Sequence, residues 1–379
     1  MSGARSAACP ECLRRAWLVG SLSGHIEKAA ADAPGSRAHE LLALSDERLV
    51  RAVARARAGS ILRGAADRDP RRLLEAVAGA GAWACCRHDG RYPSGLADLR
   101  DAPAVLFGRG DPALLGELVP DGAVTIVGTR RPSGYGRELA TSLAREVAAA
   151  GVGVVSGMAL GIDSRAHAGA LEAGGFTVAV LGNGVDIAYP ASSRQLYAQI
   201  AERGLVISEL PPGTAARRWS FPARNRIMAA LSAMTVVVEA REPSGSLITA
   251  EFAQELGRQL GAVPGRVGTS SAAGTNGLLR DGAAVIRGAG DVLDALLPIG
   301  AEARRGAFSP RGPALDAGLG RVLELVEGGA GTPDALARAS GLEPGALASA
   351  LVQLELSGYL RSDTAGRYER TPLEAPEHP

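Results

Sequence analysis

Two arginines and an asparagine stand together in FPARNRIMAALS (221–232), directly before an apolar run. A guanidinium group can form two parallel hydrogen bonds with a phosphate, and the first turn of a helix offers free N–H groups to an anion. An apolar helix without a ligand requires neither feature. Arg224, Asn225 and Arg226 therefore predict a helix that begins at an anion-binding site.

Small and polar residues also follow other β-branched, apolar runs. Because the carboxyl ends of parallel strands meet at one edge of a sheet, we expect these segments to converge there. Small residues let the backbone approach a ligand, and exposed N–H groups favour anions, so the pattern indicates a phosphate-bearing ligand. The segments are GTRRPSGYG (128–136), SGMALGIDSRAH (156–167), LGNGVDIAYP (181–190), ELPPGTAARRWSFPARNR (209–226) and EAREPSGSLITA (239–250).

Further arginines and aromatic residues lie in the same segments. A row of arginines suits a backbone with several phosphates better than one small nucleotide, and aromatic rings can stack on unpaired bases, each worth about 1–3 kcal/mol. For Trp219 and Phe221, a role in sealing the edge of the sheet fits equally well. The pattern predicts a site for single-stranded nucleic acid. These additional residues are Arg130, Arg131, Arg217, Arg218, Tyr135, Tyr189, Trp219 and Phe221.

Catalytic alternatives find less support. Asp163 and His167 are spaced as an acid–base pair would be, but no nucleophile stands beside them, which favours a capping Asp and a locally bonded His. Ser133, Ser244 and Ser246 lack a GxSxG context and are interpreted as helix caps or phosphate donors. The chain has no GK dipeptide for a Walker-type loop, and LGNGVD supplies only GxG. We expect no catalytic residue and no cofactor.

Composition limits the partners. The chain has 379 residues and a net charge of +1, so a nucleic-acid site must be a local patch. CPEC, with Cys9 and Cys12, has half of a zinc-ribbon spacing, but the vicinal Cys85 and Cys86 do not supply a second CxxC. We expect reduced thiols and no metal. Neither an apolar signal segment nor a membrane-length apolar run occurs, so we expect a cytoplasmic protein without a membrane partner.

The elements that must position these residues alternate along the centre of the chain. Helical patterns such as 137–151 and 192–204 separate the apolar runs, which is typical of βαβ units around a parallel sheet buried on both faces. The fold class is therefore α/β, and AVPG (262–265) can add a sixth strand. The five runs are AVTIVG (123–128), VGVVSG (152–157), TVAVLG (177–182), LVISEL (205–210) and MTVVVEA (234–240).

Composition divides the chain into four regions. Residues 1–85 predict a small helical module, 86–299 a Rossmann-like domain, and 300–315 a linker rich in Gly, Pro and Arg. Residues 316–372 predict a winged-helix-like domain, with two helices followed by a hairpin. Its second helix, PGALASALVQLELSG, contains no Arg or Lys, so we expect it to contact protein rather than a DNA groove, while Arg361, Arg367 and Arg370 of the hairpin leave a weak contact with the DNA backbone open.

The motifs together resemble the DNA processing protein A (DprA/Smf) family. The resemblance implies an extended Rossmann-like domain that binds and protects single-stranded DNA and loads the RecA recombinase onto it, in natural transformation and recombination, without catalytic turnover. It also implies a homodimer, to which Leu278 and Leu279 are expected to contribute, and an amino-terminal module that is SAM-like in some members. The motifs run in order from YPSGLADLRDAPAVLFGRGD (92–111) through VGTRRPSGYG, SGMALGID, GNGVDIAYP, FPARNRIMAALS, VVVEAREPSGSLITA and VPG to GTNGLLRDGA.

The resemblance also implies site residues. It places Arg130, Arg224 and Asn225 in a basic DNA pocket, and glycine-rich or polar positions at the edges of that pocket. The edge positions are Gly128, Ser133, Gly157, Asn183, Gly184 and Ser246. With Thr129, Tyr135 and Arg226 from the same segments, these are the predicted DNA-binding residues.

An enzyme remains the alternative. The cytokinin-activating phosphoribohydrolases share a related Rossmann arrangement and carry a PGGxGTxxE loop with a catalytic glutamate. The nearest segment here, PGRVGTSSAAGTNGLL, has no glutamate at that spacing. The sequence therefore favours DNA binding over hydrolysis of a nucleotide.

Overall fold

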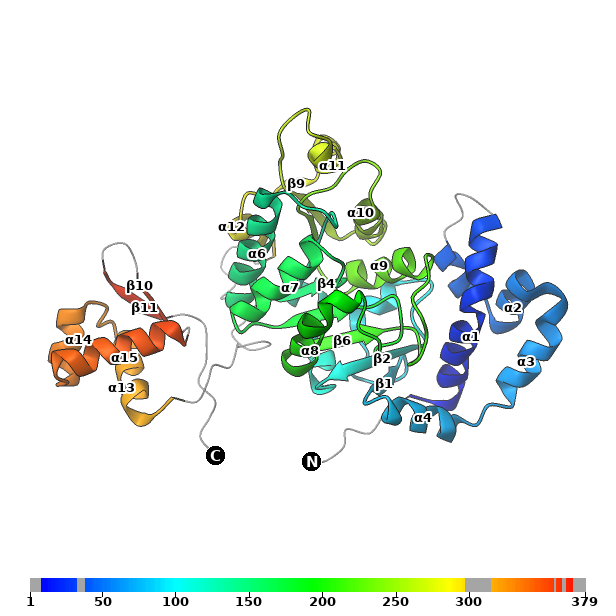
Figure 1. Cartoon of the computed structure of the whole chain (residues 1–379), viewed down its shortest axis with the longest axis horizontal. Coiled ribbons are helices and arrows are strands. Elements are labelled where there is room, and N and C mark those ends of the chain that lie inside the picture. Colours follow the sequence, from blue (N-terminus) through cyan, green and yellow to red (C-terminus); the bar gives the residue numbers. More distant parts are fainter. Residues whose placement is uncertain (1–7, 33–37, 297–314, 358, 363–365, 371–379) are drawn as a thin grey trace.

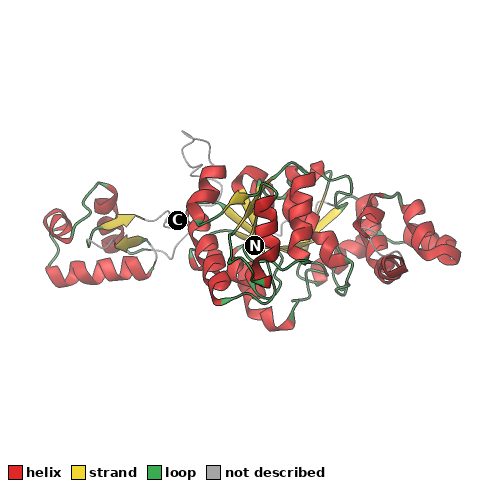
Figure 2. Ribbon diagram, turned by 90° about the horizontal axis from the view of Figure 1, so that it is seen from above, coloured by secondary structure: helices red, strands yellow, loops and turns green. Residues whose placement is uncertain are grey.

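A nine-stranded sheet forms the centre of the molecule, with helices on both of its faces (Figures 1 and 2). The structure is a computed structural model and describes residues 8–32, 38–296, 315–357, 359–362 and 366–370. The strand order is β1-β2-β6-β5-β4-β3-β7-β8-β9. The strands are β1 (Trp83–Cys86), β2 (Val105–Gly110), β3 (Ala123–Val127), β4 (Gly153–Ser156), β5 (Thr177–Val180), β6 (Leu205–Ser208), β7 (Met234–Val237), β8 (Gln259–Ala262) and β9 (Ala284–Val285).

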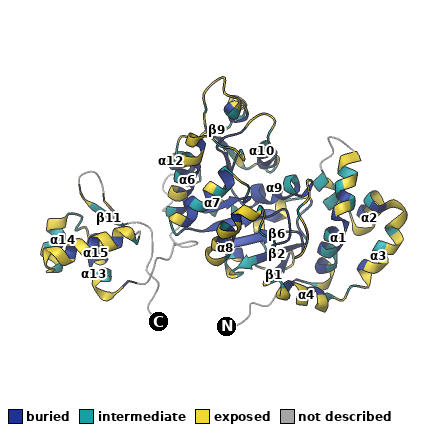
Figure 3. Cartoon of the chain, in the orientation of Figure 1, coloured by how far each residue is buried: buried dark blue, intermediate teal, exposed yellow. Residues whose placement is uncertain are grey.

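The strands are apolar throughout because both faces of the sheet are covered. Val124 and Ile126 of β3 pack into one core, while Ala123 and Val127 of the same strand pack into the other. Helices α6 (Gly134–Ala149), α7 (Ile162–Glu172) and α12 (Ala289–Leu296) cover the first face, and α9 (Ser220–Ala230) and α10 (Gly245–Glu255) cover the second. Figure 3 shows the buried strands in dark blue between helices whose outer sides are exposed.

The predicted α/β fold is confirmed, but the sheet is mixed rather than wholly parallel. β3 to β9 run parallel to one another, whereas β1 pairs antiparallel with β2, and β2 pairs antiparallel with β6. The expected boundary at residues 85/86 falls inside β1, so the sheet begins at Trp83. The sixth strand, β8, ends at Ala262, where the AVPG segment begins.

The amino-terminal helices pack on the antiparallel edge of the sheet. Leu13 and Ala16 of α1 share a core with Val105 and Phe107 of β2. The ring of Trp17 meets that of Phe107 edge-on, with 5.3 Å between centroids. These helices are therefore part of the same hydrophobic structure as the sheet. They are α1 (Pro10–Asp32), α2 (Asp46–Ala54), α3 (Ala58–Ala66) and α4 (Pro70–Gly79).

Three shorter or peripheral helices complete the central region. Two are α5 (Ala113–Glu117) and α8 (Arg194–Arg203). The third, α11 (Ala273–Arg280), contains Leu278 and Leu279, so the expected apolar turn is helical. Leu278 packs against the core under the sheet, and both leucines are partly exposed.

The carboxyl-terminal unit has its own core. Helices α13 (Ala317–Glu327), α14 (Pro333–Ser340) and α15 (Pro344–Leu356) precede a hairpin of β10 (Leu360–Ser362) and β11 (Tyr368–Arg370). Thr332 caps α14 by accepting from the Ala335 amide, and Gly341 ends it in a left-handed conformation. The winged-helix prediction is confirmed. The expected linker lies, up to residue 314, outside the described residues.

No helix within the described ranges has the length and apolar character needed to cross a bilayer.

Candidate nucleic-acid interface

The parallel part of the sheet contains a topological switch point between β3 and β7. From β3 the chain proceeds to β4, β5 and β6 on one side, and β7, β8 and β9 lie on the other. The loops after β3 and β7 lead to α6 and α10, which cover opposite faces, so the loops part and leave a crevice. A cavity of about 660 Å³ lies there, and residues of both loops line it, among them Gly128 to Arg131, Arg241 and Pro243 to Ser246.

Four exposed arginines surround this cavity. Arg130 and Arg131 follow β3, Arg218 precedes α9, and Arg241 follows β7. The first turn of α10, with Ser244 as its cap and Ser246 behind it, faces the same space. Fixed positive charge and helix N–H groups at one crest favour an anionic ligand.

Two aromatic rings stand at the cavity beside these cations. Tyr189 is 43% exposed, and its ring centroid lies 5.4 Å from that of Phe221. The Arg130 guanidinium lies over the Phe221 ring at 5.6 Å. Trp219 is instead buried under α1, where its Nε1–H donates to the Ser23 carbonyl at 3.0 Å. The sequence left two roles open for Trp219 and Phe221. Trp219 packs in the core at the edge of the sheet, whereas Phe221 lines the cavity together with Tyr189.

Arg224 lies in the wall of the cavity rather than on its surface. The residue is 5% exposed, and its Nε donates to Asn225 Oδ1 at 3.0 Å, while Nη1 donates to the carbonyls of Gly157 and Val180. Burial lowers its pKa to about 10, so the guanidinium is still charged at neutral pH. A Cβ at position 157 would collide with this guanidinium, which explains the glycine there.

The prediction that Arg226 meets DNA needs correction. Arg226 is 1% exposed and is held between two carboxylates: Nε donates to Asp101 at 2.7 Å, and Nη2 donates to Glu209 at 2.7 Å. Although burial acts to lower its pKa, these two partners raise it above the ordinary value. Its charge is neutralised inside the fold, so no phosphate can replace these partners without disrupting the core.

The two asparagines hold loops in place. Asn225 Nδ2 donates to the Gly245 carbonyl at 3.1 Å, which connects α9 to the start of α10 at the cavity. Asn183 Nδ2 donates to the carbonyls of Gly184 and Ile187 at 2.9 and 2.7 Å. Asn183 lines a smaller, adjoining hollow of about 90 Å³ together with Gly157.

Three other predicted residues do not line the main cavity. Ser133 caps α6, accepting from the Gly136 amide at 3.0 Å and donating to Glu239 at 3.0 Å. Tyr135 lies in the first turn of α6, where it is exposed in a separate hollow. Gly184 is buried in the loop after β5. Contact between these residues and DNA remains a prediction.

Asp163 and His167 are not an acid–base pair. Asp163 Oδ2 accepts from the amides of Gly157 and Ala159 at 3.2 and 3.4 Å. Burial raises the pKa of Asp163, while Arg224 acts to lower it. His167 is buried against Thr177, with Nδ1 at 2.7 Å from the hydroxyl oxygen. Both side chains therefore hold the fold, but Asp163 does not cap α7, whose N-cap is Gly161, and His167 is bonded to β5 rather than locally.

Sequence reasoning missed two residues. Arg241 is not among the predicted DNA-binding residues, yet it lines the cavity. Glu239 is 7% exposed and accepts from both the amide and the hydroxyl of Ser133, so it ties the loop after β3 to the end of β7. The available signal was their position at the carboxyl end of a predicted strand, Glu239 within the last residues of the run and Arg241 directly after it.

Fold and site together define a Rossmann-like protein with a cationic, aromatic-lined cavity at the switch point of its sheet, followed by a winged-helix unit. A sequence profile described as DNA recombination-mediator protein A matches residues 83–297, and one described as the DprA winged helix domain matches residues 307–366. The chain belongs to the DNA recombination-mediator protein A (DprA/Smf) family.

Named relatives agree with this assignment. A putative DNA processing protein DprA of Mycobacterium tuberculosis is 41% identical over 308 residues, covering 80% of this chain and 75% of that protein. DNA processing protein DprA of Bacillus subtilis is 41% identical over 206 residues, covering 54% of this chain and 68% of that protein.

Two solved structures are also similar. DprA from Streptococcus pneumoniae superposes with a TM-score of 0.59 at 30% identity, covering 75% of this chain and 95% of that one. DprA from Helicobacter pylori, studied for its single-stranded DNA binding mode, superposes with a TM-score of 0.51 at 33% identity, covering 57% and 95%.

Proposed function

We propose that this protein binds single-stranded DNA in the cavity at the β3/β7 switch point and acts, without catalytic turnover, as a recombination mediator in the cytoplasm. It protects the strand and loads the RecA recombinase onto it. The observation that carries the proposal is the grouping of four exposed arginines with Tyr189 and Phe221 at one crest. The single-strand binding of the Helicobacter pylori relative supports it.

The arrangement of charge favours a polynucleotide over a single nucleotide. Arg130, Arg218 and Arg241 come from three different loops around one opening. Separated cations match successive phosphates along a strand, and the rings between them offer stacking surfaces for unpaired bases without selecting a sequence. Binding is therefore expected to depend on strand length and salt, and little on base order.

A phosphoribohydrolase finds less support at this cavity. Among the described residues that line it, the carboxylate is that of Asp163. Asp163 is buried and already accepts two backbone N–H groups, so it lacks the exposure that a nucleophile needs. Glu239, nearby, is engaged by Ser133.

One experiment separates these functions. Fluorescence anisotropy with labelled single strands of increasing length, in parallel with an assay of base release from nucleoside monophosphates, is expected to give length-dependent binding and no cleavage. Base release at the rate of an enzyme would instead establish the phosphoribohydrolase alternative.

RecA loading and the dimer need tests of their own. Purified protein is expected to accelerate assembly of RecA on single strands covered by a single-strand-binding protein; an unchanged assembly rate would remove the loading role.

Partly exposed Leu278 and Leu279 are proposed to form part of a homodimer interface. Leu279→Glu is expected to shift the sedimentation coefficient toward the monomer, and an unchanged value would place the interface elsewhere.

A further inference from the structure

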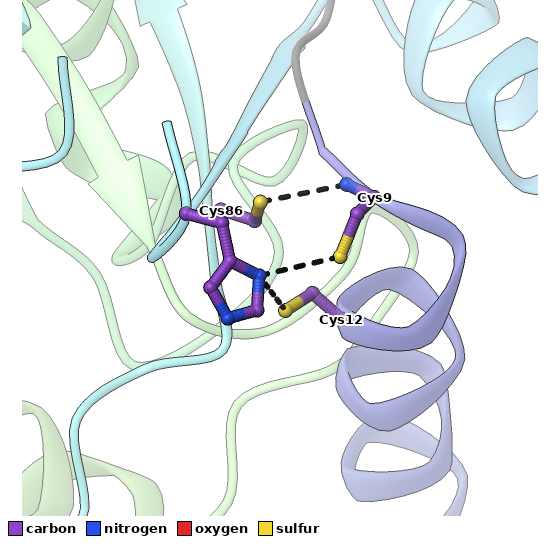
Figure 4. A group of neighbouring side chains, drawn as sticks. Cys9, Cys12 and Cys86 are labelled. Atoms are coloured by element: carbon purple, nitrogen blue, oxygen red, sulfur yellow. Dashed lines mark hydrogen bonds between the residues drawn. The ribbon is translucent and has the colours of Figure 1, made fainter. Parts of the chain in front are cut away.

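Four side chains with metal-ligating atoms meet where α1 begins and β1 ends. Cys9 directly precedes α1 and Cys12 lies in its first turn, while Cys86 and His88 come from the end of β1 and the turn after it. Their sulfur and nitrogen atoms all lie within 4.8 Å of one another. Figure 4 shows Cys9, Cys12 and Cys86 directed toward a common point.

The distances fit a tetrahedral metal site. His88 Nδ1 lies 3.5 Å from Cys9 Sγ and 3.6 Å from Cys12 Sγ. Zinc holds sulfur at about 2.3 Å and imidazole nitrogen at about 2.0–2.1 Å, so the S···N edge of a regular tetrahedron is about 3.6 Å. Three thiols and one imidazole form a donor set that prefers zinc over harder cations.

Local structure explains why these residues converge. The Cys9 carbonyl accepts from the Leu13 amide at 3.0 Å, which starts the helix and places Cys9 and Cys12 on the same turn. Successive side chains of a strand point to opposite faces, so Cys85 enters the core beneath the sheet while Cys86 faces α1. The Asp89 amide donates to the Cys86 carbonyl at 2.9 Å and closes the turn that carries His88.

A search for paired cysteines overlooks this site. The second half of the ligand set is Cys-x-His, not CxxC, and it lies far along the chain from the first half. Reduced thiols without a metal were expected because the vicinal Cys85 and Cys86 were treated as one pair. In the structure their side chains lie on opposite faces of the strand.

A redox-active Cys9–Cys12 dithiol is the competing explanation. Burial acts to raise the pKa of the Cys9 thiol, but hydrogen bonds from the Cys12 amide and from the side chains of His88, Cys12 and Cys86 together lower it to about 7. A reactive CxxC pair has that property as well. In such a pair Cys86 and His88 would act only on the Cys9 thiol, whereas a four-ligand ion uses all four donors.

We propose that Cys9, Cys12, Cys86 and His88 bind one zinc ion that fastens α1 to the edge strand of the sheet. Four protein ligands fill the coordination sphere, which is the arrangement of a structural rather than a catalytic zinc site. The ion joins segments that are otherwise held by apolar packing between α1 and β2.

The anchored helix reaches the cationic cavity. The Glu27 carboxylate, near the other end of α1, accepts from the amides of Arg218 and Trp219 at 3.3 and 3.1 Å. Zinc therefore stabilises the helix that supports the Arg218 loop, and the metal-free protein is expected to be less stable and to hold that loop less firmly. This second effect rests on the proposed function, whereas metal binding itself does not.

The test measures metal directly on the full-length protein. Chelator-treated, reduced protein is given zinc alone and desalted, and we expect about one zinc per chain by mass spectrometry. Cobalt alone is expected to produce thiolate charge-transfer and tetrahedral ligand-field absorption. Zinc removal should lower Tm, and its return should restore it.

Variants assign the ligands. Cys12→Ser and His88→Ala are expected to lose zinc, while His88→Cys, which keeps four ligands, retains it. Cys85→Ala is the matched control and should bind zinc as the natural chain does. Because His88 is exposed, its variants should fold even if Cys12→Ser does not.

Three results would overturn the proposal: reduced protein without zinc or cobalt absorption, a reversible Cys9–Cys12 disulfide in protein that takes up no metal, or equal zinc retention in His88→Ala and His88→Cys. Each of these can be obtained without any DNA-binding measurement, so they are independent of the proposed function.

Discussion

At the scale of single residues, burial divides the arginines of the site into two kinds. Arg130, Arg131, Arg218 and Arg241 are exposed around the cavity and keep their charge available. Arg224 and Arg226 are buried and already have partners within the fold. Arg224 donates to a backbone carbonyl and to Asn225, and Arg226 donates to two carboxylates. Charge that is exposed attracts a ligand, whereas charge that is paired inside the core maintains the shape of the site.

Arg130→Ala is expected to weaken single-strand binding at every base sequence and to reduce the salt dependence. Each lost phosphate contact lowers the slope of log K against log salt by about 0.7. Anisotropy titrations over a salt series measure both quantities. Arg51→Ala is the control because Arg51 is exposed on α2 and pairs with Glu47; equal slopes for Arg130→Ala and the natural chain would exclude this phosphate contact.

Arg226→Ala is expected to destabilise the fold strongly. The substitution leaves Asp101 and Glu209 nearly buried without their cation, and breaking a buried ion pair from one side costs about 3–5 kcal/mol. Thermal and urea unfolding measure the loss. Arg131→Ala, at an exposed position, should stay within about 0.5 kcal/mol of the natural chain. If the Arg226→Ala protein were as stable as the natural chain but bound DNA more weakly, Arg226 would have to be counted among the residues that contact DNA.

At the scale of elements, α7 is fastened to β5 by a buried histidine. The Thr177 hydroxyl donates to the Val154 carbonyl at 2.8 Å, so it accepts from Nδ1–H of His167. Burial, with a smaller effect from the Arg224 charge, lowers the pKa of His167 from 6.5 to about 3. The contact between α7 and β5 therefore depends on pH.

The folded protein should lose stability on acidification through this histidine. Because the folded pKa is depressed, the unfolded chain binds the proton first, and stability falls as pH drops below 6.5 toward about 3. The maximum slope is about 1.4 kcal/mol per pH unit for one group. In His167→Asn, whose amide can donate to Thr177, Tm should fall less steeply over the same range. Parallel pH profiles for the two proteins would contradict this assignment.

At the scale of the whole molecule, DNA binding and the winged unit are expected to be separable. The cavity is built from residues between Val127 and Thr249. Helix α15 contains no cation, and its exposed surface includes Val352 and Leu356. An apolar helix face without cations suits contact with protein better than contact with phosphates.

A chain that ends after residue 299 is expected to keep its single-strand affinity and to lose contacts with protein partners. Anisotropy measures the first, and the RecA assembly assay measures the second. The full-length Val352→Glu variant is the control, because it alters the exposed face of α15 without removing the unit. A fall in affinity of about 10-fold or more in the shortened chain would place DNA contacts on the winged unit.

Local sequence patterns were sufficient for much of the fold. Apolar, β-branched runs separated by amphipathic segments predicted β3 to β7, and residues 316–372 predicted two helices and the hairpin of the winged unit. The glycine and arginine segments after the strands predicted where the cavity lies. These features depend on neighbours in the chain, which a sequence displays directly.

Only the tertiary structure decided which of those residues face a ligand and which hold the fold together. Arg226 is paired with Asp101, 125 residues away, and Cys9 and Cys12 meet Cys86 and His88 only because α1 packs on the edge of the sheet. Sequence determines the charge and chemistry of each side chain, but its partners and its access to solvent follow from contacts between distant segments. Such contacts form when separate elements bury their apolar faces together, and no local pattern records them.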